Sequence, residues 1–144
     1  MAIIGGAGNP VGGSFTGPAQ ALDIYGDFAA AYSGPIATAT SDVTHLEFST
    51  GNYLFVGEIS GLMATLDSDV TTGGISLFKV SFNDGEIFTF KGESAGGGDM
   101  PTTVTLPLLI PAYTKVKVEV DSQYTAMFTA ANVIGKIFRE NAGL

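Results

Sequence analysis

The sequence predicts an all-β protein, an antiparallel sandwich of two sheets built from seven or eight strands. β-branched and aromatic residues fall in short runs, and Gly, Asp, Asn or Pro separates each run from the next. Few stretches are suited to a long helix. Of the 144 residues, 45% are hydrophobic, so we expect one domain with a core and not a disordered chain.

The first feature along the chain is an expected N-terminal arm over residues 1–32, ahead of a sandwich over residues 33–144. Residues 1–20 contain six glycines, two prolines and no charged residue, a composition that does not support a packed element. An uncharged arm of this kind is suited to lying along a neighbouring subunit, and a plain disordered terminus is the alternative. The side chains expected at such an assembly interface are Ile3, Ile4, Val11 and Phe15.

Residues 21–33 predict one short helical turn around Phe28 to Tyr32, and Gly26 prevents a longer helix. Strands then follow at short spacing. The tightest turn between them is the Asn-Asp-Gly stretch at 83–85, because these residues tolerate a positive φ. The expected strands cover residues 43–49, 53–66, 75–82, 86–91, 102–110, 115–120 and 124–140.

Glycine, proline and alternation give these strands finer detail. Gly57 and Gly61 lie inside the strand expected at 53–66 and predict a bulge or a bend there. Pro107 cannot donate to a ladder, so it indicates an edge strand or a bulge. Alternation predicts the side chains that share one face in each of two later strands, and for residues 115–120 it predicts that the valine face points into the sandwich. These are Phe78, Val80, Phe82, Val116, Val118 and Val120.

Charge and composition exclude several kinds of partner and site. Six basic residues against fourteen acidic ones give a net charge of −8, which argues against binding to nucleic acid or to an anionic membrane. Without cysteine there is neither a disulfide framework nor a thiolate metal site. The first residues show no basic stretch followed by an apolar core, so we expect no secretory signal.

The motif with the strongest enzymatic appearance is "GESAG" at 92–96, which matches the nucleophile elbow of hydrolases around Ser94. That elbow requires a helix after the serine and a histidine later in the chain. Here glycines, Asp99 and Pro101 follow Ser94, and the single histidine, His45, precedes it. We therefore expect a loop at this motif, and no catalytic residue.

Metal and cofactor sites are not expected either. "DSDVTTGG" at 67–74 places Asp67, Asp69 and Thr71 at alternate positions, but it lacks the glycine and glutamate that a calcium loop requires later. His45 has no partner histidine or cysteine at metal-ligand spacing, so it is read as a satisfied or an exposed strand residue. "GGAGNPVGG" at 5–13 departs from the dinucleotide-binding pattern.

Three glutamates on different strands are the remaining candidates for chemistry. Glu47, Glu58 and Glu86 could pair as in a glycosidase if two of them came within about 5–10 Å of each other. Charged residues on the solvent face of a sheet are the usual explanation, and we favour it here.

Three stretches, taken in order, resemble a known group of proteins. They are "SGPIATATSDVTHLEFSTGNYLFVGEISG" (33–61), "LLIPAYTKVKVEV" (108–120) and "NVIGKIF" (132–138). They are similar to the entry and turn, the Ile-Pro-aromatic corner and the closing strand of small single jelly-roll structural proteins of tailed phages and related aquatic viruses. That group includes capsid decoration proteins. Ala112 stands where a second proline is typical of the corner.

The resemblance implies a sandwich of the jelly-roll type and a non-enzymatic virion protein, either a capsid decoration protein or a minor capsid component. It implies sister subunits, in a trimer, and other capsid proteins as partners, without a cofactor. The chain would be made in the host cytoplasm and reside in the virion. At the corner, we expect Pro111 to end one strand, and Tyr113 to bury its ring while its hydroxyl reaches a backbone group.

A carbohydrate- or receptor-binding module is the alternative, because jelly rolls also serve as lectin domains. Such a module needs exposed aromatic side chains at loop tips, and the absence of Trp weighs against it. The candidate aromatic residues are Tyr25, Tyr32, Tyr53 and Tyr124.

Overall fold

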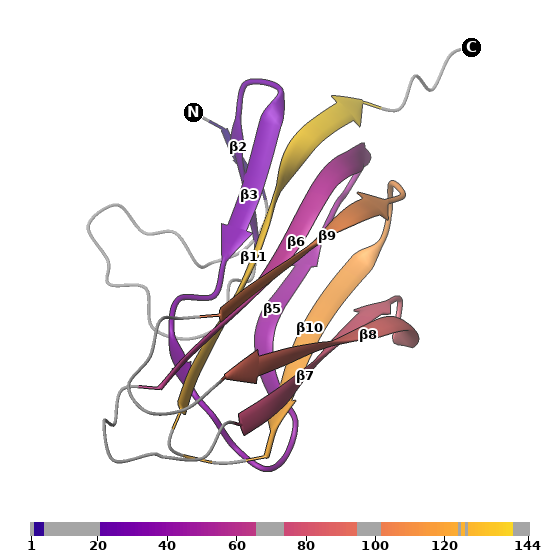
Figure 1. Cartoon of the computed structure of the whole chain (residues 1–144). Coiled ribbons are helices and arrows are strands. Elements are labelled where there is room, and N and C mark those ends of the chain that lie inside the picture. The colour runs from indigo at the N-terminus through magenta and orange to yellow at the C-terminus, as the bar shows by residue number, and fades with distance from the viewer. Residues whose placement is uncertain are drawn as a thin grey trace.

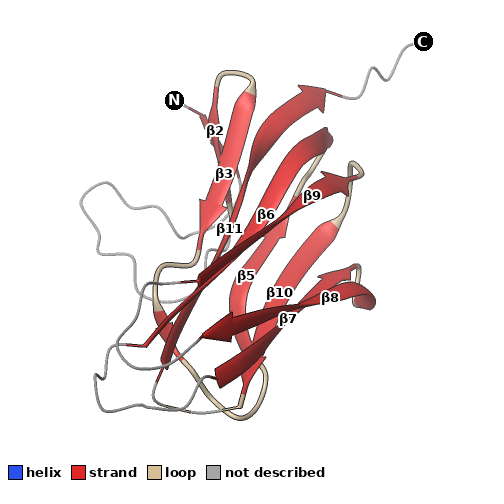
Figure 2. Ribbon diagram, viewed as in Figure 1, coloured by secondary structure: helices blue, strands red, loops and turns tan. Residues whose placement is uncertain are grey.

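The computed structural model describes residues 2–4, 21–65, 74–94, 102–123, 125 and 127–139. Every regular element in these residues is a β-strand (Figure 2). The strands are β1 (Ala2–Ile4), β2 (Leu22–Tyr25), β3 (Phe28–Tyr32), β4 (Ile36–Ala37), β5 (Val43–Ser49), β6 (Tyr53–Thr65), β7 (Gly74–Phe82), β8 (Gly85–Ser94), β9 (Thr102–Ile110), β10 (Lys115–Ser122) and β11 (Met127–Arg139).

The described strands form two antiparallel sheets that pack against each other, so the predicted all-β sandwich is confirmed (Figure 1). The larger sheet has the order β1-β2-β3-β11-β6-β9, and the short β4 pairs with β11 further along the edge that β3 occupies. The smaller sheet has the order β5-β10-β7-β8. From β4 to β11 the chain changes sheet at every connection except the β7–β8 hairpin.

The core lies between the two inner faces and follows the predicted alternation. Val116, Val118 and Val120 of β10 are fully or almost fully buried, as are Phe78 and Val80 of β7. The ring of Phe78 stacks on that of Phe90 in β8 with their centroids 4.9 Å apart. The larger sheet contributes the other half of the core, with Phe55, Ile59, Met63, Leu108, Ile110, Val133 and Ile137 among its buried side chains.

The helical turn expected around Phe28 to Tyr32 is wrong, because these residues form strand β3. Gly26, at φ +63°, lies in the turn between β2 and β3, so the two strands form a hairpin. Alanine favours helices, but pairing with β11 overrides that preference and buries Ala29 and Ala31. Residues 22–32 therefore belong to the larger sheet and not to an arm.

Of the bulge or bend expected at the glycines of β6, the bulge is not present. β6 pairs with β11 over its whole length without a shift of register, and Gly57 lies opposite Gly135. A Cβ atom on Gly57 would overlap the carbonyl oxygen of Ile134, and one on Gly135 would lie 2.5 Å from the carbonyl oxygen of Val56. These glycines permit close approach of two central strands, which is the other reason for glycine inside a strand.

The predictions made from Pro107 and Pro111 agree with the structure. Pro107 lies in β9, the last strand of the larger sheet, so its expected place on an edge strand is confirmed. β9 ends directly before Pro111, as expected, and the corner there leads from the larger sheet to the smaller one.

Tyr113 does not have the role expected at this corner. The residue is 67% exposed, and its φ is +57°, in the left-handed region. The buried Thr50 holds the corner instead: its hydroxyl donates to the carbonyl oxygen of Pro111 at 2.9 Å and accepts from the amide of Thr114 at 3.0 Å. A hydroxyl from a neighbouring turn thus replaces the expected tyrosine contact.

The arm residues predicted for assembly fall partly within the described chain. Ile3 and Ile4 belong to β1, which pairs with β2 of the same chain and extends the larger sheet. Val11 and Phe15 lie outside the described residues. An assembly role for these four residues stays a prediction.

Candidate functional site

The residues of the apparent nucleophile elbow do not come together. Ser94 ends β8, and His45 lies on β5 at the opposite edge of the smaller sheet. With β7 and β10 between them and about 4.8 Å per strand, the two backbones are roughly 14 Å apart. His45 is therefore not placed to activate Ser94.

His45 instead joins the two sheets. It is 1% exposed, with its Nδ1 2.9 Å from the carbonyl oxygen of Val43 and its Nε2 2.8 Å from the hydroxyl of Thr129 in β11. Because a carbonyl only accepts, Nδ1 carries the proton and the Thr129 hydroxyl donates to Nε2. Burial lowers the pKa of His45, and its hydrogen bonds to the backbone partly oppose that shift. His45 is therefore a buried strand residue with both ring nitrogens hydrogen-bonded, which is one of the two interpretations that the sequence allowed.

The three candidate glutamates do not converge. Glu47 lies 3.0 Å from the Lys115 ammonium on the outer face of the smaller sheet. Glu86, on the far strand of that sheet, accepts from the Thr89 hydroxyl at 2.5 Å. Glu58 projects from the outer face of the larger sheet, on the opposite side of the sandwich.

No cluster of three potential metal ligands occurs in the part of the chain that the structure describes. Asp67, Asp69 and Thr71 lie outside that part. The described residues also contain no helix long and apolar enough to cross a membrane.

The outer face of the smaller sheet is charged and ion-paired. Lys79 lies 2.7 Å from Asp42, and this contact raises the pKa of the lysine. The remaining lysines of this face also lie beside acidic groups, in the pairs Lys91–Glu93, Lys115–Glu47 and Lys117–Glu119. Such a face is suited to contact with water.

The outer face of the larger sheet carries most of the exposed large apolar side chains, beside polar ones such as Ser60 and Thr105. Ten large apolar side chains of the described residues are exposed, and seven of them project from this side, which concentrates them on one sheet. We call this surface the apolar face. Its seven exposed members are Tyr25, Phe28, Tyr32, Val56, Leu109, Ile134 and Phe138.

Strand register arranges the apolar face in rows that cross the sheet. One row contains Tyr25, Phe28, Lys136, Val56 and Leu109, one from each of β2, β3, β11, β6 and β9. The next row contains Asp23, Ala30, Ile134, Glu58 and Pro107 from the same five strands.

Two charged groups lie at the centre of this arrangement. The ammonium of Lys136 lies 5.5 Å from the centre of the Phe28 ring, a cation–π contact. No salt bridge joins Lys136 or Glu58 to another described residue, unlike the lysines of the smaller sheet.

The tyrosines considered for sugar binding are spread out. Tyr25 and Tyr32 are both exposed, but they lie two rows apart, which corresponds to roughly 13 Å along the strands. Tyr53 packs against the core, and Tyr124 lies outside the described residues.

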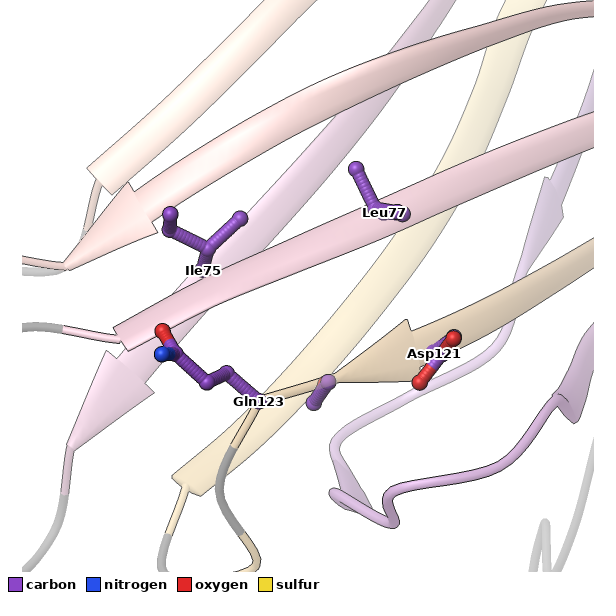
Figure 3. Close-up of a pocket in the computed structure, with 5 residues that line it drawn as sticks. Ile75, Leu77, Asp121 and Gln123 are labelled. Carbon is purple, nitrogen blue, oxygen red and sulfur yellow. The ribbon is translucent and has the colours of Figure 1, made fainter.

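A shallow pocket lies at one end of the smaller sheet (Figure 3). Ile75 and Leu77 of β7 lie on one side of it, and Asp121 and Gln123 at the end of β10 lie on the other. Its fifth residue, Ser122, is buried and has its hydroxyl 2.6 Å from that of Ser76. Since that serine is already hydrogen-bonded, the polar groups left to a ligand are those of Asp121 and Gln123.

The chain matches no protein-family model, and no curated protein is significantly similar to it. The resemblance to virion jelly rolls therefore stays a prediction. The apolar face is the candidate functional surface that the geometry itself provides.

Sequence reasoning missed this surface, although a signal was present. Strands with one wet face alternate apolar and polar residues, whereas 53–56, 108–110 and 133–134 are runs of consecutive apolar residues. Such runs indicate strands whose two faces are both apolar.

Proposed function

We propose that this chain is a non-enzymatic structural protein that acts by burying the apolar face against other subunits of an assembly. The assembly we favour is a virion, in which the chain would be a capsid decoration protein or a minor capsid component. The observation that carries the proposal is the contrast between an ion-paired outer face and an apolar one on the same sandwich.

The size of the apolar face supports a role in contact. The two rows above and the next one, which contains Tyr32, Asn132, Ser60 and Thr105, lie about 6.7 Å apart on strands spaced by about 4.8 Å, so the whole face, polar side chains included, has a flat area of roughly 500 Å². An apolar patch on a face of this size falls within the range of the largest patch on an ordinary monomer, about 300–600 Å², and such patches are often functional. Its removal from water would stabilise an assembly by roughly 25 cal/mol for each Å² of apolar surface.

The strand order supports the virion assignment. If β3 and β4 together count as the first of eight strands, the larger sheet reads 1-8-3-6 and the smaller reads 2-7-4-5. We infer from this order that the sandwich is of the jelly-roll type, an architecture common in viral capsid domains.

A carbohydrate-binding module is the second candidate, because Tyr25 and Phe28 are exposed side by side at the β2–β3 turn. Aromatic rings of this kind can stack on sugars, but specific recognition also needs convergent polar groups. In the same row, the next three side chains are those of Lys136, Val56 and Leu109, of which only the lysine is polar.

A pair of matched variants in the natural source of the chain tests the proposal. Ile134→Asp places a carboxylate in the apolar face, and Ile87→Asp places one at the exposed bulge of β8, in the smaller sheet. The two isoleucines are 49% and 54% exposed, so both variants should fold. Lysates separated on a density gradient are probed for the chain and for nuclease-protected nucleic acid.

The native chain and Ile87→Asp should sediment with nuclease-protected particles, and Ile134→Asp should stay with soluble protein. If native chain and protected nucleic acid never sediment together, the virion assignment is overturned. If Ile134→Asp enters particles as well as Ile87→Asp does, the apolar face is not the contact surface.

A further inference from the structure

We propose that the apolar face pairs with the same face of a second copy of this chain about a two-fold axis, with Glu58 of each copy against Lys136 of the other. This inference rests on the proposed function, because it takes the apolar face to be a contact surface and names the partner. Four residues at the centre of the face carry it.

These four residues form a block of two rows on two neighbouring strands. In the β6–β11 register, Glu58 lies opposite Ile134, and Val56 lies opposite Lys136. The two charges therefore occupy one diagonal of the block, and the two branched apolar side chains occupy the other. Diagonal neighbours on a sheet are about 7–8 Å apart.

Two-fold symmetry makes this diagonal pattern complementary to itself. In a two-fold interface, if one residue contacts a second residue of the partner, that second residue contacts the first in return. An axis lying in the interface along the Val56–Ile134 diagonal sets each of these residues near its own copy. The same axis exchanges the other diagonal, so Glu58 meets Lys136 twice across the interface.

The charges themselves favour this partner over an apolar one. Burying a carboxylate or an ammonium without an opposite charge costs several kcal/mol. Within the described residues, neither Glu58 nor Lys136 has a salt bridge of its own. A second copy supplies both missing partners in one arrangement, whereas a purely apolar surface would leave both charges buried and unpaired.

The area is consistent with a dimer that depends on concentration. Two faces of roughly 500 Å² each bury about 1,000 Å² in total, near the lower limit for a specific interface. The proposal therefore expects monomer–dimer exchange in dilute solution, and full pairing where copies are held close together in an assembly.

Charge reversal in the full-length protein tests the pairing. Glu58→Lys gives a chain with two lysines at the centre of the face, and Lys136→Glu gives a chain with two glutamates there. Analytical ultracentrifugation should show the native chain dimerising to twice its 14.8 kDa. Each single variant should dimerise roughly a hundredfold more weakly, because like charges then meet at both contacts.

Mixing the two single variants is the decisive measurement. An equimolar mixture of the two single variants should recover a dimer that contains one chain of each, and the double variant Glu58→Lys/Lys136→Glu should dimerise as the native chain does. Circular dichroism melting establishes that all variants are folded. A native chain that stays monomeric, single variants that dimerise normally, or a mixture that does not recover would each overturn the inference.

The two proposals fail separately. A native chain that is monomeric in solution, but needs Ile134 to enter particles, overturns the second copy and leaves the proposed function standing. A native dimer that obeys the charge rules, while Ile134→Asp still enters particles normally, overturns the proposed contact surface in the assembly. A trimer that is indifferent to both charge reversals overturns the two-fold pairing alone.

Discussion

The two outer faces of this sandwich differ in a way that folding does not require. Each sheet needs one apolar face for the shared core and can leave the other in water. The smaller sheet does so, since each of its outer lysines lies beside an acidic group. The larger sheet has a second apolar face centred on Val56 and Ile134.

This contrast separates two kinds of contribution that one apolar residue can make. Side chains on the inner faces stabilise the monomer, because they leave water when the chain folds. Side chains on the apolar face remain exposed after folding, so they add little to the stability of an isolated chain. Stability and association should therefore respond to different substitutions.

The largest expected effect is on the inner side of the smaller sheet. Val118 is 0% exposed, and Val118→Asp buries an unpaired carboxylate at a cost of about 3–5 kcal/mol, comparable with the stability of such a domain. Circular dichroism melting should find this variant unfolded or nearly so. Lys117→Asp, on the outer side of the same strand, should melt close to the native chain. Similar losses for both would show that the inner and outer sides are wrongly assigned.

The sequence was sufficient for the fold class and for the inner faces. Strict alternation around Val118 and the proline at position 111 are local signals, because neighbouring residues alone make them recognisable. The inward side chain of Val118 and the end of a strand at Pro111 are both confirmed. The β2–β3 hairpin was missed because Ala29 to Ala31 favour a helix until pairing with β11 makes a strand better. That pairing joins residues about a hundred positions apart, which local propensity does not register.

The candidate surface was less predictable than the fold. Sequence reasoning placed the assembly contacts on the uncharged N-terminal arm, because an absence of charge is visible without a structure. The apolar face combines residues of five strands, and only the register brings Leu109, Val56 and Phe28 into one row. The diagonal arrangement of Glu58 and Lys136 also exists only once β6 and β11 are paired.

The second-largest effect concerns the strands that support the apolar face. In Gly57→Ala, the new Cβ would collide with backbone atoms of β11, and the two central strands would have to separate. We expect a loss of about 1–3 kcal/mol, measured by urea unfolding. Gly85→Ala is the matched control, since its Cβ would come no closer than 3.5 Å to the carbonyl oxygen of Phe82. Equal losses would contradict the close approach of β6 and β11.

A smaller effect is expected from a change of pH, because His45 is buried between the two sheets. Burial lowers the pKa of His45 below its ordinary value of 6.5, so the unfolded chain binds a proton more readily than the folded one. The contribution of His45 to the free energy of unfolding is complete above pH 6.5. It is lost as the pH falls below 6.5, by at most about 1.4 kcal/mol per pH unit. In His45→Gln, which does not titrate, the decline in melting temperature between pH 7 and about 5.5 should be shallower. Identical slopes would mean that His45 is not responsible.

The smallest effect on stability provides the sharpest comparison of the two faces. Lys117→Glu and Lys136→Glu make the same chemical change and shift the net charge of −8 equally, but on opposite outer faces. Neither lysine is in the core, so both variants should melt close to the native temperature; Lys117→Glu should lose slightly more, because it replaces an ion pair with Glu119 by a like-charge contact.

Self-association measured by ultracentrifugation should then separate the two variants completely. Lys117→Glu should dimerise as the native chain does, because its face is not involved in the proposed pairing. Lys136→Glu should lose the dimer, because two carboxylates would then meet at each of the two central contacts. If both variants weaken association to the same extent, overall charge repulsion governs association, and the difference between the two outer faces has no part in it.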